Sequence, residues 1–217
     1  MCKPSNNRYL LCKGHSQLGK PLWAGNRPKS DEEAKLRLCV AALECLKRSG
    51  LEKATMSDIA KEAGVARPTL YKHFKSKIEI FFAAIDMVAF TFTQSVVEHA
   101  QHFATVEERI VETIIYVVKE LPQHRYLSLV LDNECAAALK ARAFSDDATL
   151  VFSKMVAGPL VEIQPDLEDQ GIEIAEVMSR FAISIILFPG RYSTDFEGLR
   201  RLIQKRVLPG LIPQIQS

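Results

Sequence analysis

Residues 55–74 read TMSDIAKEAGVARPTLYKHF, and their order predicts two short helices that cross through a tight turn. Gly64 can adopt the left-handed backbone conformation that closes the first helix. Arg67 precedes a proline, which disfavours helical geometry at Arg67, and Pro68 suits the first position of the second helix. The apolar side chains expected to form the core between the two helices are Ile59, Ala63, Val65, Leu70 and Phe74. The stretch therefore predicts a helix-turn-helix.

The second of these helices has a face suited to a DNA groove. If Leu70 and Phe74 point inward at i and i+4, the side chains that lie on its other faces are Thr69, Tyr71, Lys72 and His73. These groups, with Arg67, can reach base edges or phosphates. Thr55 or Ser57 can cap the first helix where its N–H groups also suit a phosphate, and Lys77 follows close behind. The alternatives are a helix-turn-helix used only for packing and, for His73, a solvated surface histidine.

The rest of the chain is predicted to be helical, because apolar residues recur at spacings of three and four and strand signals are scarce. Three boxes in which Ser or Thr precedes Glu by three residues, at 30–33, 76–79 and 105–108, mark helix starts. We expect helices over 31–48, 56–62, 68–74, 77–102, 106–120, 124–142, 146–163, 167–187 and 196–207. The fold class is all-α. The predicted domains are a basic, flexible arm at 1–29, a three-helix DNA-binding domain at 30–80 and a larger helical domain for ligand binding and dimerisation at 81–217.

Charge divides the chain in the same place. Residues 1–80 hold 16 basic and 8 acidic residues, whereas residues 81–217 hold 12 basic and 18 acidic ones. A net charge of +8 followed by −6 indicates that the first part meets a polyanion. No apolar run reaches the roughly 20 residues of a membrane span, and the short apolar patch near the N-terminus does not make a signal peptide. We expect a cytoplasmic protein without a membrane anchor, whose five scattered cysteines are thiols.

The run from Thr55 to Lys77, preceded by Gly50, closely resembles the TetR family of transcriptional regulators over about residues 31–85. The resemblance implies homodimers, usually repressors, that bind palindromic operator DNA and are released by a small-molecule effector. It places Thr55, Ser57 and Lys77 at phosphates. It places Arg67, Pro68 and Thr69 at bases, and Tyr71 and His73 at the groove edge or backbone. The 29-residue arm is longer than in many relatives, and it either follows the minor groove or has no role.

The sequence of the larger domain contains fewer signals of function than the helix-turn-helix does. Its many aromatic and Met residues are more typical of a core than of a pocket. The polar residues with apolar neighbours that we predict as effector contacts are Tyr116, Asn133 and Glu134. The apolar stripes of 167–187 and 196–208 predict a dimer interface formed by Ile174, Met178, Phe181, Ile185, Leu199, Leu202 and Ile203. The alternative is that both helices only complete the core of one chain.

Two other classes of function fit the sequence less well. For an enzyme, the sequence offers no catalytic constellation, no phosphate-binding glycine loop and no metal framework beyond His99 with His102, so we expect no enzyme activity, metal or cofactor. A helical, dimeric interaction adaptor without specific DNA binding is the remaining alternative, and it leaves the charge asymmetry unexplained. The sequence therefore favours a DNA-binding regulator.

Overall fold

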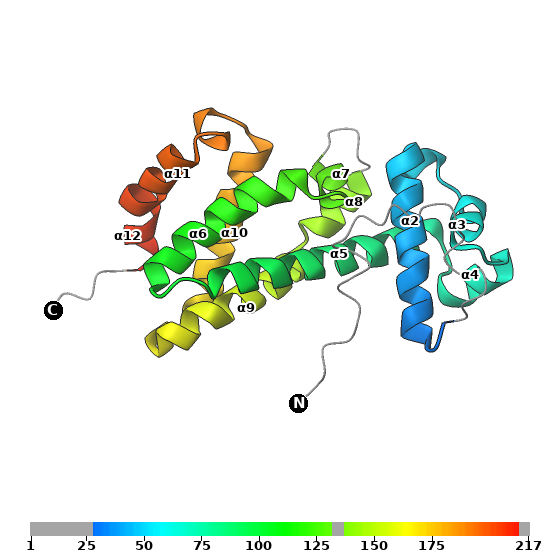
Figure 1. Cartoon of the computed structure of the whole chain (residues 1–217), viewed down its shortest axis with the longest axis horizontal. Helices are drawn as coiled ribbons and strands as arrows, with labels where there is room; N and C mark the ends of the chain where they lie inside the picture. The colour runs from blue at the N-terminus through cyan, green and yellow to red at the C-terminus, as the bar shows by residue number, and fades with distance from the viewer. Residues whose placement is uncertain (1–27, 132–136, 213–217) are drawn as a thin grey trace. The chain divides into compact units, whose positions relative to one another are not determined.

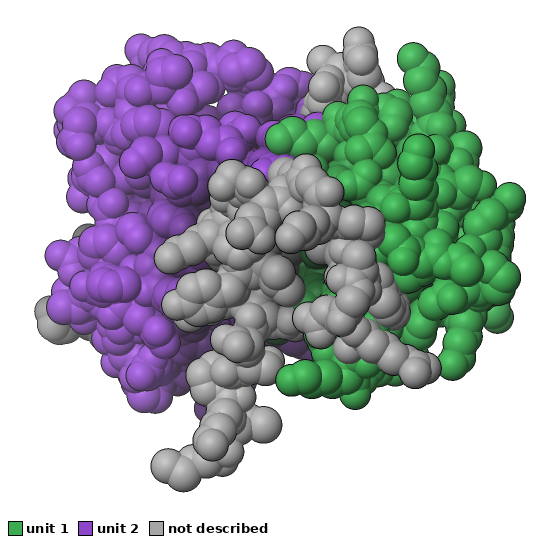
Figure 2. Space-filling model, turned by 45° about the vertical axis from the view of Figure 1, so that its right-hand side comes forward, with its two compact units in different colours: residues 1–91, 132–143 green, residues 92–131, 144–217 purple. Residues whose placement is uncertain are grey.

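The computed structural model describes residues 28–131 and 137–212, and every regular element within them is a helix (Figure 1). The expected all-α fold is confirmed. By packing, the chain divides into two compact units, drawn green and purple in Figure 2. Unit 1 comprises residues 1–91 and 132–143, and unit 2 comprises residues 92–131 and 144–217. The predicted boundary at residue 80 separates a DNA-binding domain from a domain for ligand binding and dimerisation. This division by function stays a prediction.

Unit 1 contains the N-terminal helices. They are α2 (Asp31–Lys53), α3 (Met56–Ala63), α4 (Arg67–His73), the first part of α5 (Lys77–Ala100) and α8 (Ala137–Ala143). Helix α3 packs against both α2 and α4. The large side chains that are fully buried in this unit are Leu38, Leu43, Ile59, Leu70, Ile80, Phe81, Ile85 and Leu139. Helix α8 is bound to α5 by a bidentate pair, in which Arg142 Nε and Nη2 lie 3.1 and 2.6 Å from the carboxylate oxygens of Asp86.

Helix α2 is interrupted near its end, as the Ser-Gly at 49–50 predicts. Gly50 has φ 72° and ψ 169°, a conformation that favours glycine, and the chain turns there before residues 51–53 complete a last turn. Cys39 and Cys45 are buried thiols on the apolar face of α2, and burial raises their pKa values to about 12 and about 11. At these two cysteines the expectation of thiols is confirmed, and such thiols are unreactive at neutral pH.

Unit 2 is built from the remaining helices. They are α6 (Val106–Glu120), η1 (Leu121–Gln123), α7 (Leu127–Leu131), α9 (Asp146–Ile163), η2 (Pro165–Leu167), α10 (Gly171–Leu187), η3 (Arg191–Ser193), α11 (Phe196–Leu202), η4 (Ile203–Val207) and α12 (Leu208–Leu211), together with the end of α5. Helix α10 packs closely along α9 and also contacts α6, while α11 lies against α6. Arg200 on α11 holds Glu112 on α6 with two bonds of 2.8 Å.

A buried arginine joins α6 to α9. The Arg109 side chain is 9% exposed, its Nε donates to the carbonyl of Phe103 at 2.9 Å, and its guanidinium also donates to the carbonyl of Pro159. The carboxylate of Glu162 lies 3.8 Å from the same guanidinium. Because a buried guanidinium must have acceptors, this side chain fixes where α9 packs on α6.

Part of the predicted dimer interface lies inside unit 2. Ile174, Met178, Leu199 and Ile203 are 3% exposed or less, because α10 turns its apolar stripe toward α6 and α9, and α11 turns its own toward α6. The prediction is therefore wrong for these four residues, which form core. Phe181, Ile185 and Leu202 are half-buried, and for them an interface role stays a prediction.

Several predicted helix boundaries also differ. The helix expected over 124–142 is represented by α7 and α8, with residues 132–136 outside the described part. Helix α10 begins at Gly171 rather than 167, since Pro165 starts a separate short 3-10 turn. The box at 105–108 forms fully. At 30–33 and 76–79 the serine accepts from the glutamate N–H, but each glutamate accepts from the residue before the serine, Lys29 or Lys75.

Within the described residues, α5 is long and apolar enough to pass a length-and-hydropathy test for a membrane span, and 44% of its apolar window is buried. A core helix of a soluble protein passes the same test, so this is weak evidence for a membrane segment.

Candidate nucleic-acid interface

The turn between α3 and α4 has the geometry that its residues predict. Gly64 lies in the left-handed region at φ 72° and ψ 33°, and Val65 N donates back to the carbonyl of Ala60 at 2.9 Å. Helix α4 then starts at Arg67, one residue before the predicted start, so that Pro68 occupies the second helical position. This closure satisfies the last carbonyls of α3 and brings α4 directly against it.

Helix α4 is anchored from behind by two apolar side chains. Leu70 is fully buried and Phe74 is 5% exposed, and Ile59 and Ala63 of α3, the helix that packs against α4, are buried as well. The buried positions follow the predicted i, i+4 pattern. The orientation of α4 is therefore set by core packing, which leaves its opposite faces to solvent.

Four of the predicted contact residues on α4 are exposed together. They are Arg67, Pro68, Tyr71 and Lys72. Thr69, which lies between them in the sequence, is half-buried. Tyr71 is 44% exposed, an unusual place for an aromatic ring, and the Arg67 guanidinium lies 6.0 Å from its centroid. We call the exposed surface of Arg67, Pro68, Tyr71 and Lys72 the α4 face. It combines two cations with an aromatic edge on a short helix, which is the chemistry that reads a groove.

His73 does not belong to the α4 face. Its side chain is only 9% exposed, and Nδ1 lies 3.0 Å from a carboxylate oxygen of Asp31 in the first turn of α2. The expectation of an exposed His73 is wrong, because this position lies against the start of α2, three residues after the buried Leu70. Hydrogen bonding to Lys35, with smaller contributions from the charges of His73 and Lys72, lowers the pKa of Asp31. A DNA contact by His73 stays a prediction.

Lys77 and Thr55 also have partners within unit 1. Lys77 Nζ donates to the carbonyls of Leu51 and Glu52 at 2.8 and 3.2 Å, where α2 ends after its glycine turn. The Thr55 hydroxyl accepts from the Asp58 N–H at 3.2 Å and the Thr55 N–H donates to the Asp58 carboxylate at 3.0 Å, so the two residues form a capping box, and the hydroxyl also donates to that carboxylate at 2.6 Å. Both side chains therefore have a structural role. Ser57 is exposed at the start of α3, and the phosphate contacts predicted for all three stay predictions.

Sequence reasoning missed three of these interactions: the Thr55 box, the contact of His73 with Asp31, and the bonds from Lys77 to the end of α2. The Thr55 box was detectable, because aspartate at the third position of a helix can replace the glutamate of the usual box. The contact between His73 and Asp31 joins residues 42 positions apart, and no local pattern encodes it.

The fold and the α4 face define a helix-turn-helix protein of the nucleic-acid-binding class. Residues 38–84 match the family model described as bacterial regulatory proteins, tetR family. The transcriptional activator FasR of Mycolicibacterium smegmatis is 43% identical over 61 residues, which are 28% of this chain and 27% of FasR. The match thus spans about a quarter of that relative's length. Residues 38–84 are therefore similar to the DNA-binding domain of the TetR family, and the resemblance seen in the sequence is confirmed for this region.

Solved structures extend the likeness to the whole fold. The TetR family repressor AlkX from Dietzia sp. strain DQ12-45-1b superposes with a TM-score of 0.61 at 20% identity, covering 82% of this chain and 94% of AlkX. The regulator FadR from Bacillus subtilis, solved with stearoyl-CoA, gives a TM-score of 0.54 at 18% identity and covers 78% and 97% of the two chains. At such identities the likeness concerns the fold alone.

Proposed function

We propose that this chain is a ligand-responsive transcriptional regulator that binds a palindromic DNA operator as a homodimer. In this proposal it acts as a repressor and is released by a small-molecule effector bound in its larger, helical part. The observation that carries the proposal is the α4 face, which presents Arg67, Tyr71 and Lys72 to solvent while Leu70 and Phe74 are buried behind them.

The experiment is a selection of duplexes from the gene's own upstream DNA, followed by fluorescence anisotropy on the selected duplex and on a scrambled one. We expect a preference of at least about a thousandfold for the selected duplex and a steep fall of affinity with salt, because phosphate contacts release counterions. No preference, with no salt dependence, would favour the interaction adaptor instead. A reporter gene under the selected operator then distinguishes repression from activation.

The dimer in this proposal forms through the outer faces of α9 and α10. Large apolar side chains exposed on these two helices are Leu150 and Val151 on α9, and Ile172, Val177 and Leu187 on α10, with Phe188 following α10. Two packed helices with exposed apolar residues can pair with the same two helices of a second copy around a two-fold axis. In this arrangement the contact uses exposed residues of α10, and not the buried Ile174 and Met178.

Replacing Val177 with Glu is expected to convert the dimer to a monomer, because two added carboxylates would meet near the symmetry axis in an apolar contact. Sedimentation velocity measures the change. Phe90→Glu is the control, since Phe90 is also an exposed apolar side chain, at 49%, but lies on α5, outside both helices of the proposed contact. A dimer that survives Val177→Glu, or that dissociates equally in both variants, would contradict this arrangement.

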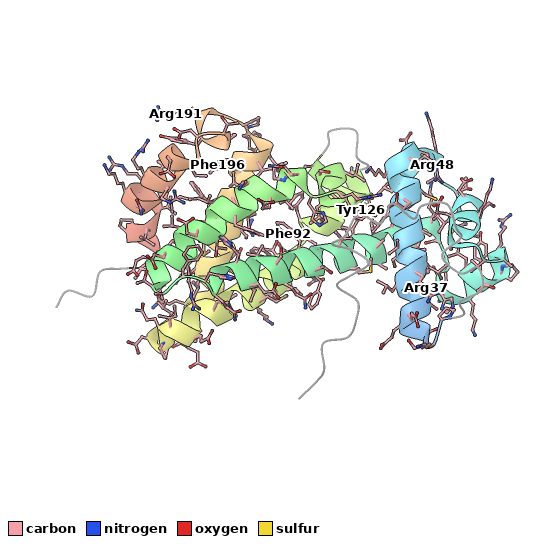
Figure 3. The ribbon with its side chains drawn as sticks, viewed as in Figure 1. Arg37, Arg48, Phe92, Tyr126, Arg191 and Phe196 are labelled. Atoms are coloured by element: carbon pink, nitrogen blue, oxygen red, sulfur yellow. The ribbon has the colours of Figure 1, made fainter. Side chains whose placement is uncertain are left out.

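The effector in this proposal contacts Tyr116. Its ring stacks on His99 with centroids 4.4 Å apart and lies 6.3 Å from Phe92, which in turn is 5.6 Å from His124 (Figure 3 labels Phe92). Two buried hydroxyls of the same unit, Thr113 on α6 and Ser153 on α9, have no hydrogen-bond partner among the described residues. A unit that holds both unpaired buried hydroxyls and a cluster of aromatic rings suits a mostly apolar ligand with a few polar groups. Asn133 and Glu134, also predicted as contacts, lie outside the described residues.

The two histidines of this cluster predict a pH dependence of stability. Burial lowers the pKa of His99, although the charge of Glu112 acts in the opposite direction, and burial lowers the pKa of His124. Below a pH of about 6.5 the unfolded chain binds protons that the folded chain resists, so stability is full above that pH and falls as the pH drops. We expect the urea midpoint to decrease between about pH 7.5 and about pH 5.5.

His124→Asn should reduce this decrease while keeping an acceptor for the backbone N–H of Leu127, which lies 3.3 Å from His124 Nδ1. His102→Asn is the control, because His102 is exposed. An unchanged pH profile in His124→Asn would show that this imidazole does not resist protonation in the folded protein.

A further inference from the structure

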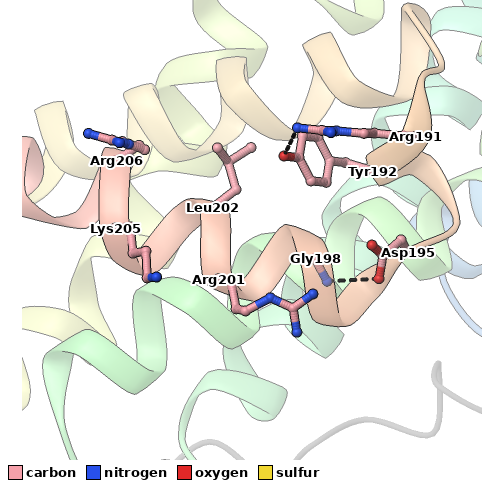
Figure 4. A pocket seen from close by; sticks show the side chains of 8 residues that line it. All are labelled: Arg191, Tyr192, Asp195, Gly198, Arg201, Leu202, Lys205 and Arg206. Atoms are coloured by element: carbon pink, nitrogen blue, oxygen red, sulfur yellow. Dashed lines mark hydrogen bonds between the residues drawn. The ribbon is translucent and has the colours of Figure 1, made fainter.

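Unit 2 has an open hollow near its C-terminal end that is lined by cations. It has a volume of about 330 Å³, and Figure 4 shows side chains entering it from two sides. Arg191 and Tyr192 come from η3, while Arg201, Lys205 and Arg206 come from α11 and η4. We call this the basic hollow. It is unexpected in a part of the chain where acidic residues outnumber basic ones by 18 to 12.

The carboxylates near the basic hollow are already engaged. Asp195, which also lines it, accepts from the N–H of Gly198 at 2.8 Å and caps α11. Glu112 and Glu197 both bind Arg200, whose pKa they raise. Within the described residues, no salt bridge joins a carboxylate to Arg191, Arg201, Lys205 or Arg206, and Asp195 is the acidic residue among those that line the hollow.

Four like charges around one hollow repel each other, and an anion placed among them removes that repulsion. Arg191 is already held in place, because its guanidinium lies 4.6 Å from the Tyr192 ring centroid and donates to the Tyr192 hydroxyl at 2.5 Å. The hydroxyl hydrogen of Tyr192 remains available as a donor. A fixed guanidinium loses little conformational freedom when it binds the oxygens of a phosphate.

The helix itself is distorted at this place. Pro209 has no N–H, so the carbonyl of Lys205 lacks its usual helical donor, and Leu208 N bonds instead to the carbonyl of Ile203, five residues back. The resulting π-turn carries Lys205 and Arg206. Such turns are rare and occur frequently at functional sites.

We propose that the basic hollow binds a small anion with at least two negative charges, of the phosphate ester or diphosphate class. Its concave shape and its volume, at the lower end of the range for small-molecule sites, favour a small ligand over the convex surface of a duplex. The basic hollow is separate from the α4 face and from the aromatic cluster around Tyr116. This inference therefore does not depend on the proposed function.

The test is isothermal titration of the full-length protein with inorganic pyrophosphate and with inorganic phosphate at low ionic strength. We expect saturable binding of pyrophosphate, tighter than that of phosphate. Arg201→Gln combined with Lys205→Gln should weaken pyrophosphate binding about tenfold or more, because it removes two charge-assisted contacts. Lys119→Gln combined with Lys154→Gln is the matched control, since it removes the same net charge from exposed positions of the same unit and should change affinity less than about twofold.

Arg191→Gln provides a second, single change in the hollow and should also weaken binding. Thermal unfolding of each variant checks that the fold is intact. Equal losses in the hollow and control variants, or no saturable pyrophosphate binding by the unchanged protein, would overturn the proposal. So would hollow variants that lose affinity for a random DNA duplex but not for pyrophosphate, because the surface would then be a nucleic-acid contact.

Discussion

Replacing Tyr71 with Ala is expected to weaken binding to the selected operator by about ten- to a hundredfold, the usual range for a side chain that reads a base or groove edge. The ring is 44% exposed on the α4 face and supports no core, so the change should leave the fold intact. Fluorescence anisotropy on operator and scrambled duplexes measures the effect. Binding to the scrambled duplex should change much less, because it depends on charge.

Phe90→Ala is the matched control, since Phe90 is also an exposed aromatic residue of unit 1, at 49%, but lies on α5. Lys72→Ala gives a second comparison, and it should weaken binding to both duplexes similarly and reduce the salt dependence by about one unit of slope. If Tyr71→Ala lost affinity equally on both duplexes, Tyr71 would have no role in reading the sequence.

Arg109→Leu is expected to lower the free energy of unfolding by about 2–4 kcal/mol, because it leaves buried carbonyl oxygens without their donor. The carbonyls concerned belong to Phe103 and Pro159, and leucine keeps only the apolar stem of the arginine. Urea denaturation followed by circular dichroism measures the change. The loss should appear as a lower midpoint with an unchanged slope.

Arg180→Leu is the control for this prediction. Arg180 pairs with Glu176 one turn away on α10, at 2.7 Å, but its side chain is 64% exposed. Exposed pairs at this spacing contribute about 0.3–0.5 kcal/mol, so the control should be nearly neutral. If both variants lost a similar free energy of unfolding, the buried contacts of Arg109 would stabilise the protein no more than an exposed ion pair does.

The helix-turn-helix could be predicted in detail because its determinants are local. A glycine that closes one helix, a proline at the start of the next and apolar residues at fixed spacing act within a few residues of each other. Gly64 and Leu70 occupy their expected places, and Pro68 lies one position further into its helix than expected. The exposure of Tyr71 and Lys72 follows from the same spacing. His73 was misplaced because its burial depends on Asp31, which begins another helix.

In the larger part of the chain, the spacing of apolar residues predicts the helices but not which partner covers each apolar face. An apolar stripe on α10 indicates that one face is buried, but it does not say whether α6 and α9 or a second copy of the chain covers it. Met178 lies in the core of its own chain, whereas Val177, its neighbour in sequence, is exposed. Only the packing of three helices distinguishes them.

The sequence by itself determined the helical class, the helix-turn-helix and the side of its second helix that faces solvent, because helix ends and helix faces are set by neighbouring residues. The tertiary structure alone decided that His73 and Lys77 bind other parts of unit 1, that Arg109 joins α6 to α9, and that four unpaired cations surround one hollow. These features depend on contacts between residues far apart in the chain, or on the absence of such contacts in the described part. A local sequence pattern predicts neither.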